Sequence, residues 1–296
     1  MNPRARTAVD ARAGLLMVFL CSLWGFTHVT GKLAAPDISL IMQGGLRAAL
    51  ATVLLLAWCA WQRRPLFDRD GTFWVGIVAG LLFAGEFLFV FGGLAHTAAS
   101  RMVVFLYLAP VLTALGIHRF VPGEQLRPIQ WIGVGTAFAG LLAAFGEGFF
   151  HARGSLLGDV FGIIAAVMWA ATTVWIRATR LSHVSADKVL FYQLAVCSIV
   201  MTAASPLMGE PGVVRWSPIA IGSLFFQGAV VAFASYLAWF RLLTRYRATN
   251  LSVFGFLTPL FGVLAGVVTL GERASLTFLA AVALVGVGIL LVNRRA

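Results

Sequence analysis

An acidic residue in the middle of an apolar stretch is the first candidate for chemistry. Glu86 lies in the sequence LLFAGEFLFVFGG, with leucine, phenylalanine and small residues on both sides. A charge at the centre of a bilayer costs at least about 2.5–3.5 kcal/mol, so Glu86 needs a reason to be there. One interpretation is a site that takes a proton or binds a substrate amine. The alternative is an ion pair with Arg47, a structural charge that we place at a similar depth.

Polar and aromatic side chains recur at helical spacing in two matching stretches. Trp24 and His28 are four positions apart in LWGFTHVTGK, so they share one face of a helix. The stretch MWAATTVWIR aligns with it and places Trp169 on Trp24 and Thr173 on His28. An indole N–H in lipid seeks a hydrogen-bond partner, which a cavity can supply. The alternatives are that the tryptophans only pack and that His28 is a hydrogen-bonded core residue.

Further aromatic residues could complete a cavity wall. In a chain with 24 Phe an aromatic stripe is usually core packing. Together with a few polar groups, however, the stripe has the ordinary composition of a small-molecule site. We therefore predict that substrate contacts also come from Phe83, Phe87, Tyr107, Ser235, Tyr236 and Trp239.

Two prolines lie inside apolar segments, where a proline removes a helix hydrogen bond. Pro110 and Pro259 are 149 positions apart, and each is followed by a Gly-Glu pair, Gly123-Glu124 and Gly271-Glu272. Each helix should therefore bend at its proline. The bend is either a fixed kink or a hinge, and the duplication at matching places favours a hinge.

The elements that hold these residues are apolar segments long enough to cross a membrane. Hydrophobic residues make up 60% of the chain and charged residues 11%, against about 25% charged residues in soluble domains. A span needs about 20 apolar residues. Taken in order, such segments predict an all-α membrane protein with ten transmembrane helices near 14–33, 38–61, 72–95, 99–119, 127–146, 155–178, 186–208, 217–241, 248–270 and 274–292.

The matching stretches indicate that the chain is two copies of one half. We expect the copies to be residues 1–146 and 147–296. Two long copies in an apolar chain are typical of a pseudo-symmetric membrane transporter, so we expect them to form one transport unit. Five spans in each half is an odd number, so the second copy must cross the membrane in the opposite sense. Lys and Arg concentrate at one set of segment ends, which places both termini in the cytoplasm. This bias explains the net charge of +11 without a nucleic-acid partner.

These motifs carry a resemblance to a known family. They are Leu23-Trp24-Gly25 with Lys32 following, Leu46-Arg47, the AHTAAS of residues 95–100, Thr258-Pro259 and the two Gly-Glu pairs. In this order they resemble the EamA-type members of the drug/metabolite transporter superfamily, and within it the amino-acid exporters, including the YddG type. The resemblance implies ten helices in two inverted repeats, and a transport activity.

Enzyme signatures are missing from the sequence. There is no HExxH, Walker loop, GxSxG or cluster of His and Cys, so we expect no enzyme, metal or cofactor. We expect a secondary transporter in the inner membrane that exports small metabolites, amino acids first among them, by alternating access around a central cavity. The alternative is a non-transporting membrane sensor or accessory protein of the same fold, and a channel is a weaker third. The expected partners are a small-molecule substrate and membrane lipid, with the chain a monomer or a homodimer.

Overall fold

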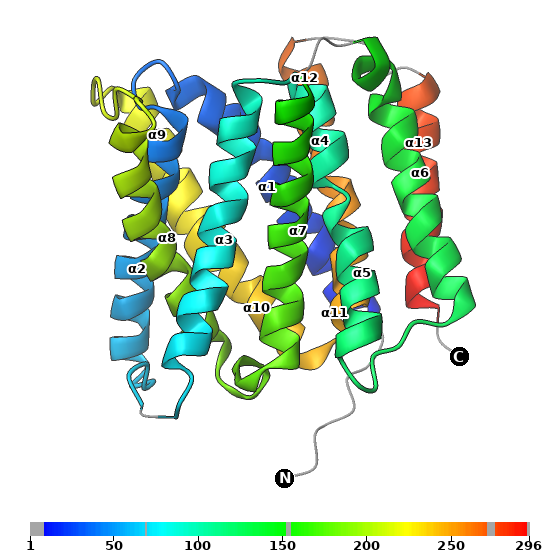
Figure 1. Cartoon of the computed structure of the whole chain (residues 1–296), viewed down its shortest axis with the longest axis horizontal. Helices are drawn as coiled ribbons and strands as arrows, with labels where there is room; N and C mark the ends of the chain where they lie inside the picture. The colour runs from blue at the N-terminus through cyan, green and yellow to red at the C-terminus, as the bar shows by residue number, and fades with distance from the viewer. Residues whose placement is uncertain (1–8, 69, 152–154, 271–275, 295–296) are drawn as a thin grey trace.

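The protein is a bundle of ten spans in a computed structural model that describes residues 9–68, 70–151, 155–270 and 276–294 (Figure 1). Ten stretches of the described chain are long and apolar enough to cross a membrane, which confirms the all-α membrane fold. Seven are the single helices α1 (Ala11–Ala34), α2 (Leu40–Trp61), α3 (Phe73–Leu94), α6 (Pro128–His151), α7 (Leu156–Ala178), α8 (Ala186–Leu207) and α13 (Leu276–Asn293).

The remaining three spans are broken into shorter pieces. The fourth consists of α4 (Ala99–Leu106) and α5 (Ala109–Phe120). The eighth runs through α9 (Pro218–Phe225), the π-helix η2 (Phe226–Ser235) and α10 (Tyr236–Arg245). The ninth contains α11 (Ala248–Ser252), the 3-10 turn η3 (Val253–Phe256) and α12 (Leu257–Leu270). A further 3-10 turn, η1 (Arg180–His183), follows α7.

Both prolines follow directly after a break in their helix. α4 ends one turn before Pro110, and the 3-10 turn η3 precedes Pro259. The expected bend is therefore present at both places, because a proline cannot donate the hydrogen bond that would continue the preceding turn. The π-helix in the eighth span was not expected, since no proline or glycine pair marks it.

Polar residues start several of the spans. The side chains of Asp10, Ser155, Ser185 and Ser217 each accept a hydrogen bond from the backbone N–H three residues further on. Such a cap satisfies one of the backbone donors that a helix start leaves open. The sequence thus marks these boundaries with a residue type as well as with a change of hydropathy.

The two ends of the described chain lie at the same end of the bundle, which we call the terminal end (Figure 1). The Tyr246 hydroxyl donates to Asp10 at 2.7 Å, and Asn250 Nδ2 donates to Asn293 Oδ1 at 3.1 Å. The connections from α2 to α3, α5 to α6, α7 to α8 and α10 to α11 also lie there. We call the opposite end, where α1 meets α2, the far end. That the terminal end is cytoplasmic stays a prediction from the charge bias, and Arg153, expected on the other side, lies outside the described residues.

The close contacts between α6 and α13 occur in pairs that the sequence repeat relates to each other. A Cβ atom on Gly133 would lie 2.8 Å from the Gly288 carbonyl oxygen, and one on Gly140 would lie 2.9 Å from the Ala281 carbonyl oxygen. Positions 133 and 281, like positions 140 and 288, are 148 apart in the sequence. Small residues allow this close approach of two helices in a membrane.

Candidate functional site

Trp24 of α1 contacts the eighth span through one hydrogen bond and two rings. Its Nε1 donates to Ser235 Oγ at 2.9 Å. Its ring lies 6.2 Å from Tyr236 and 5.8 Å from Trp239, edge to face in both cases. Tyr236 in turn lies 6.0 Å from Phe83 of α3. The structure therefore brings together five predicted site residues from three spans.

The π-helix sets the position of Ser235 in this cluster. Ser235 is the last residue of η2, and its Oγ donates to the Val231 carbonyl at 2.6 Å while it accepts from Trp24. A π-helical turn holds more residues than an α-helical one, which changes the direction of the side chains that follow it. Ser235 and Tyr236 thus reach Trp24 from neighbouring positions.

Arg47 and Glu86 are both buried, with 8% of each residue exposed. The Arg47 guanidinium lies over the Phe87 ring, 4.6 Å from its centroid, a cation–π contact. Phe87 also lies 5.2 Å from Phe83, so this arginine adjoins the aromatic cluster. In the described part of the chain no ion pair or hydrogen bond joins Arg47 to Glu86.

Tyr107 and Trp169 form a second aromatic pair, from α4 and α7. Their rings lie 5.5 Å apart, edge to face. Tyr107 is buried, just before the break in the fourth span, and Thr173 is buried one turn after Trp169.

His28 differs from the other predicted site residues because its side chain is exposed. It adjoins Gly262 of α12, where a Cβ atom would lie 4.0 Å from the imidazole Cδ2. The charge of Arg47 also acts on it. His28 lies closer to the far end than Trp24, on the same helix.

A buried ion pair closes the terminal end, and sequence reasoning missed it. Arg177 of α7 lies 2.8 Å from Glu124, and both side chains are buried. Arg177 also donates to the carbonyls of Leu243 at 2.7 Å and Tyr246 at 2.8 Å, while Glu124 accepts from the Ala248 N–H at 3.0 Å. The sequence showed Arg177 only as one of many basic residues at a segment end. The repeated Gly-Glu motif was the one available signal for Glu124.

More ion pairs surround this closure. Asp187 at the start of α8 lies 2.7 Å from Arg64 and 3.4 Å from Arg241. Lys188 lies 2.7 Å from Asp70, and this hydrogen bond lowers the pKa of the Asp70 carboxyl to about 2. These contacts connect both halves of the chain at the terminal end.

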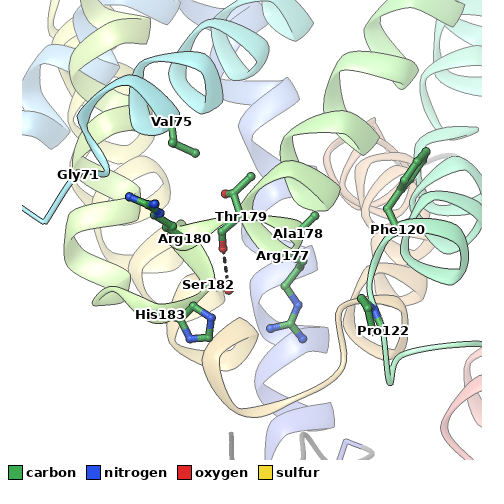
Figure 2. A pocket seen from close by; sticks show the side chains of 10 residues that line it. All are labelled: Gly71, Val75, Phe120, Pro122, Arg177, Ala178, Thr179, Arg180, Ser182 and His183. Atoms are coloured by element: carbon green, nitrogen blue, oxygen red, sulfur yellow. Dashed lines mark hydrogen bonds between the residues drawn. The ribbon is translucent and has the colours of Figure 1, made fainter. Parts of the chain in front are cut away.

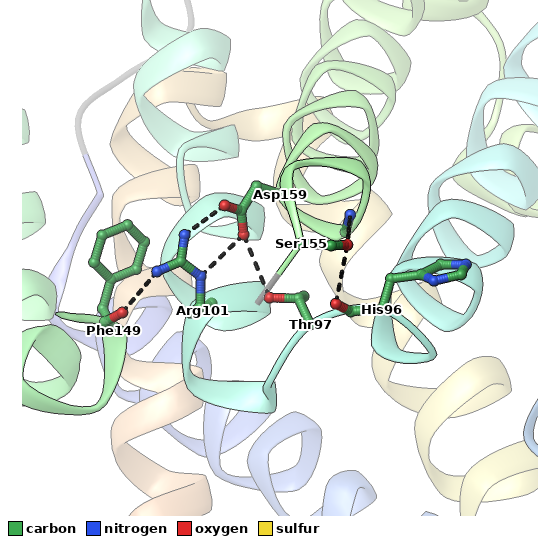
Figure 3. Close-up of polar contacts among 7 residues, drawn as sticks. His96, Thr97, Arg101, Phe149, Ser155 and Asp159 are labelled. Atoms are coloured by element: carbon green, nitrogen blue, oxygen red, sulfur yellow. Dashed lines mark hydrogen bonds and ion pairs between the residues drawn. The ribbon is translucent and has the colours of Figure 1, made fainter. Parts of the chain in front are cut away.

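Polar contacts at the far end include two groups of charged side chains that share no residue. In the first group, Arg101 Nε donates to Asp159 at 3.1 Å, Thr97 donates to Asp159 at 3.3 Å, and Arg101 donates to the Phe149 carbonyl at 2.9 Å (Figure 3). It ties the start of α4 to α6 and α7.

In the second group, Asp37 accepts from Arg215 at 3.0 Å and from the Ser217 hydroxyl. It ties the connection between α1 and α2 to the start of α9. Among the residues described, no hydrogen bond or ion pair connects Arg101 or Asp159 of the first group to any of these three.

A hollow of about 480 Å³ lies at the terminal end, away from the aromatic clusters (Figure 2). Arg177 borders it, together with the exposed Arg180 and His183 of η1. None of the predicted site residues lines it. The described part of the chain has no group of three or more His, Cys, Asp or Glu side chains that could hold a metal ion.

Known proteins resemble this chain over nearly its whole length. A protein of Archaeoglobus fulgidus named an uncharacterized transporter is 24% identical over 90% of this chain and 91% of its own. A protein of Escherichia coli named a probable amino-acid metabolite efflux pump is 23% identical over 93% and 92%. One solved crystal structure, 21% identical, has a TM-score of 0.79 over 96% of this chain and 99% of its own, which shows the same fold. The EamA-like transporter family matches twice, at residues 12–146 and 156–294, and the chain therefore belongs to this family of the drug/metabolite transporter type.

Proposed function

We propose that the protein is a secondary transporter that exports small metabolites, amino acids in particular, across the inner membrane. Substrate would bind in a central cavity between two inverted repeats, and the two ends of the bundle would open in alternation. The name of the Escherichia coli relative supports amino-acid export. Another relative from the same organism is named an inner membrane transporter, which supports the compartment.

The observation that carries the proposal is the difference between the two ends. At the terminal end the buried Arg177–Glu124 pair, with its bonds to Tyr246 and Ala248, ties α7 and the loop after α5 to the eighth and ninth spans. At the far end the Arg101–Asp159 and Arg215–Asp37 pairs are more exposed, and they share no residue. This is the pattern expected of a transporter that is shut toward one side of the membrane and can open toward the other.

The aromatic clusters lie between these two ends and supply the substrate contacts. Trp24, Tyr236 and Trp239 would form one wall, and Tyr107 with Trp169 the opposite wall. His28, exposed on the far-end side of Trp24, would meet substrate entering or leaving there. Thr173 would line the wall next to Trp169.

The breaks before Pro110 and Pro259 are the proposed hinges. Each lies within a span that contacts a site helix: α5 packs against α7, and α12 packs against α1. A hinge at these places would let the outer part of each span move while the aromatic cluster keeps its contacts. The contacts between α6 and α13 occur in pairs related by the repeat, which supports two halves with equivalent roles in such a cycle.

Flux measured in liposomes tests the proposal. The purified protein is reconstituted, the vesicles are loaded with radiolabelled amino acids, and release is followed against protein-free vesicles. We expect release that saturates with concentration, and a strong loss of release in Trp24→Ala and Trp169→Ala. Trp74→Ala is the matched control, because Trp74 is 75% exposed at the start of α3.

The outcomes separate the alternatives. A folded wild-type protein that releases none of the amino acids would contradict the proposal and favour a membrane sensor or accessory protein. Release that does not saturate would favour a channel. Equal loss in all three tryptophan variants would mean that Trp24 and Trp169 only pack.

A further inference from the structure

We propose that Arg47 and Glu86 bind the two charges of a zwitterionic amino acid, Arg47 its α-carboxylate and Glu86 its α-ammonium group. The inference rests on the proposed transport function and names the substrate class of the same site. It gives Arg47 a direct contact with substrate in place of a structural charge.

Two buried ionisable side chains make no hydrogen bond or ion pair in the described part of the chain. Arg47 and Glu86 are each 8% exposed, and neither forms a hydrogen bond or ion pair among the described residues. Burying a charge is costly unless it is paired and hydrogen-bonded. Other buried charges of this protein follow that rule, since Arg177, Asp187 and Lys188 all have partners. The two exceptions are neighbours, because Arg47 lies over the ring of Phe87, the residue that follows Glu86 in α3.

Two such side chains of opposite sign can each bind the opposite charge of a molecule that carries both signs. α2 begins at the far end with Leu40, and Arg47 is seven residues along it. α3 ends at the far end with Leu94, and Glu86 is eight residues before that end. At a rise of about 1.5 Å per residue, both charges lie roughly 10–12 Å inside the far end. A small zwitterion entering from the far end would meet both at the same depth.

The contact with Phe87 prepares Arg47 for a carboxylate. A guanidinium that lies over a ring can still donate through its N–H groups, because they point outward in the guanidinium plane. Carboxylates bind this fork through two parallel hydrogen bonds. The matching position in the second half is the neutral Gln193, which is fully buried. Of these two matching positions, only Arg47 provides a guanidinium, which suits the binding of one carboxylate.

The neighbouring rings indicate which side chain the substrate carries. Phe83 lies 6.0 Å from Tyr236, and Tyr236 adjoins Trp24. Phe83 also lies 5.2 Å from Phe87, the ring that Arg47 covers, so these aromatic residues continue from the Arg47 contact. Aromatic walls with a few fixed polar groups favour an apolar or aromatic side chain. The preferred ligands should therefore be amino acids such as phenylalanine or leucine.

Binding to the purified protein tests the inference without any need for transport. The twenty protein amino acids are screened in detergent for stabilisation against heat. The strongest is compared with its amine and its acid, which for phenylalanine are phenethylamine and 3-phenylpropionate. Wild-type protein should bind the zwitterion most tightly. Arg47→Gln should weaken the amino acid about ten- to a hundredfold, since a charge-assisted hydrogen bond is worth roughly 1.5–3 kcal/mol, and leave the amine unchanged.

Glu86→Gln should give the reverse selectivity. It should weaken the amino acid and the amine and leave the acid unchanged. The control is Arg245→Gln, which removes an exposed cation at the end of α10 and should change none of the three affinities. Arg47→Lys keeps the charge but loses the fork, so it should retain part of the affinity.

Three results would overturn the inference. One is that no amino acid stabilises the wild-type protein. A second is that Arg47→Gln weakens the amine as much as the amino acid. The third is that Arg47→Gln fails to fold while Arg47→Lys folds with full affinity, which would make Arg47 a structural charge. Selective binding without flux in liposomes would instead leave this inference standing and contradict the proposed transport.

Discussion

The guanidinium of Arg177 lies 2.8 Å from the carboxylate of Glu124, with 2% and 7% of the two side chains exposed. The two residues come from different halves of the chain, as defined by the sequence repeat. Their further bonds to Tyr246 and Ala248 place four spans around one buried pair. Separating such a pair leaves two buried charges without partners, which is costly, and the pair must separate if the terminal end is to open.

Removing one member of this pair should destabilise the protein. Glu124→Gln leaves the Arg177 charge buried without its counter-charge, and breaking a buried pair in this way costs about 3–5 kcal/mol. We expect a clearly lower melting temperature in detergent and a partial recovery in the double variant Glu124→Gln with Arg177→Gln. Arg180→Gln is the control, because Arg180 is exposed on the neighbouring turn. A melting temperature of Glu124→Gln equal to that of the wild type would show that the pair does not hold the terminal end closed.

The orientation in the membrane can be tested by thiol labelling. Gln62→Cys lies in the exposed loop after α2 at the terminal end, and Val214→Cys is exposed at the far end. We expect an impermeant thiol reagent to label position 214 on whole cells and position 62 only after permeabilisation. Cys21, Cys59 and Cys197 are buried, so the native background should be low. Labelling of position 62 on intact cells would reverse the predicted topology.

Acid should weaken the contact between Asp70 and Lys188. The hydrogen bond from Lys188 lowers the pKa of Asp70 to about 2, against about 3.9 in an unfolded chain. Because the folded state favours the ionised carboxylate, the contact stabilises the protein above about pH 4 and is lost as the pH falls through about 2. The difference in melting temperature between wild type and Asp70→Asn should therefore shrink over this range.

The matched control for the acid experiment is Asp68→Asn. The Asp68 side chain makes no ion pair among the described residues, and only its backbone carbonyl accepts from Lys188. It should show no such convergence with the wild type on acidification. A constant difference between wild type and Asp70→Asn across the range would contradict the prediction.

Close packing of α6 on α13 gives a sharp test with two neighbouring glycines. A Cβ atom on Gly288 would lie 2.6 Å from Gly133 O and Ala137 N, whereas one on Gly286 would meet nothing within 4 Å. Gly288→Ala should therefore force the helices apart, at a cost of about 1–3 kcal/mol for overpacking. Gly286→Ala should leave the melting temperature unchanged or raise it slightly. Equal effects of the two substitutions would contradict the packing described.

The sequence predicted the spans and the two broken helices because each has a strong local signal. Apolar length marks a span. Pro110 marks the break at Tyr107 between α4 and α5, and Pro259 marks the break at η3. Trp24 and Tyr236 could be chosen by aromatic type and helical spacing. Their contact could not be foreseen, since it depends on how the first span packs against the eighth.

Other features have no local signal at all. Arg177 and Glu124 lie at segment ends, where charges are expected anyway, so nothing in the sequence marks them as partners. The π-helix needs only a small surplus of residues within a long apolar run, which hydropathy does not reveal. The burial of Arg47 against Phe87 follows from the packing of neighbouring helices, and a single sequence does not specify that packing.

The π-helix η2 lies in the span where the second half is longer than the first. Matched positions are 145 apart at Trp24 and Trp169 but 149 apart at Pro110 and Pro259, so the second half is longer by four residues between these points. Its eighth span has 28 residues, against 22 in its counterpart α3. A π-helical stretch can hold part of the additional residues within the span, so the connecting loops need not become longer. After an ancestral duplication, growth within a membrane helix could in this way give the two copies different cavity walls while their ends stayed in register.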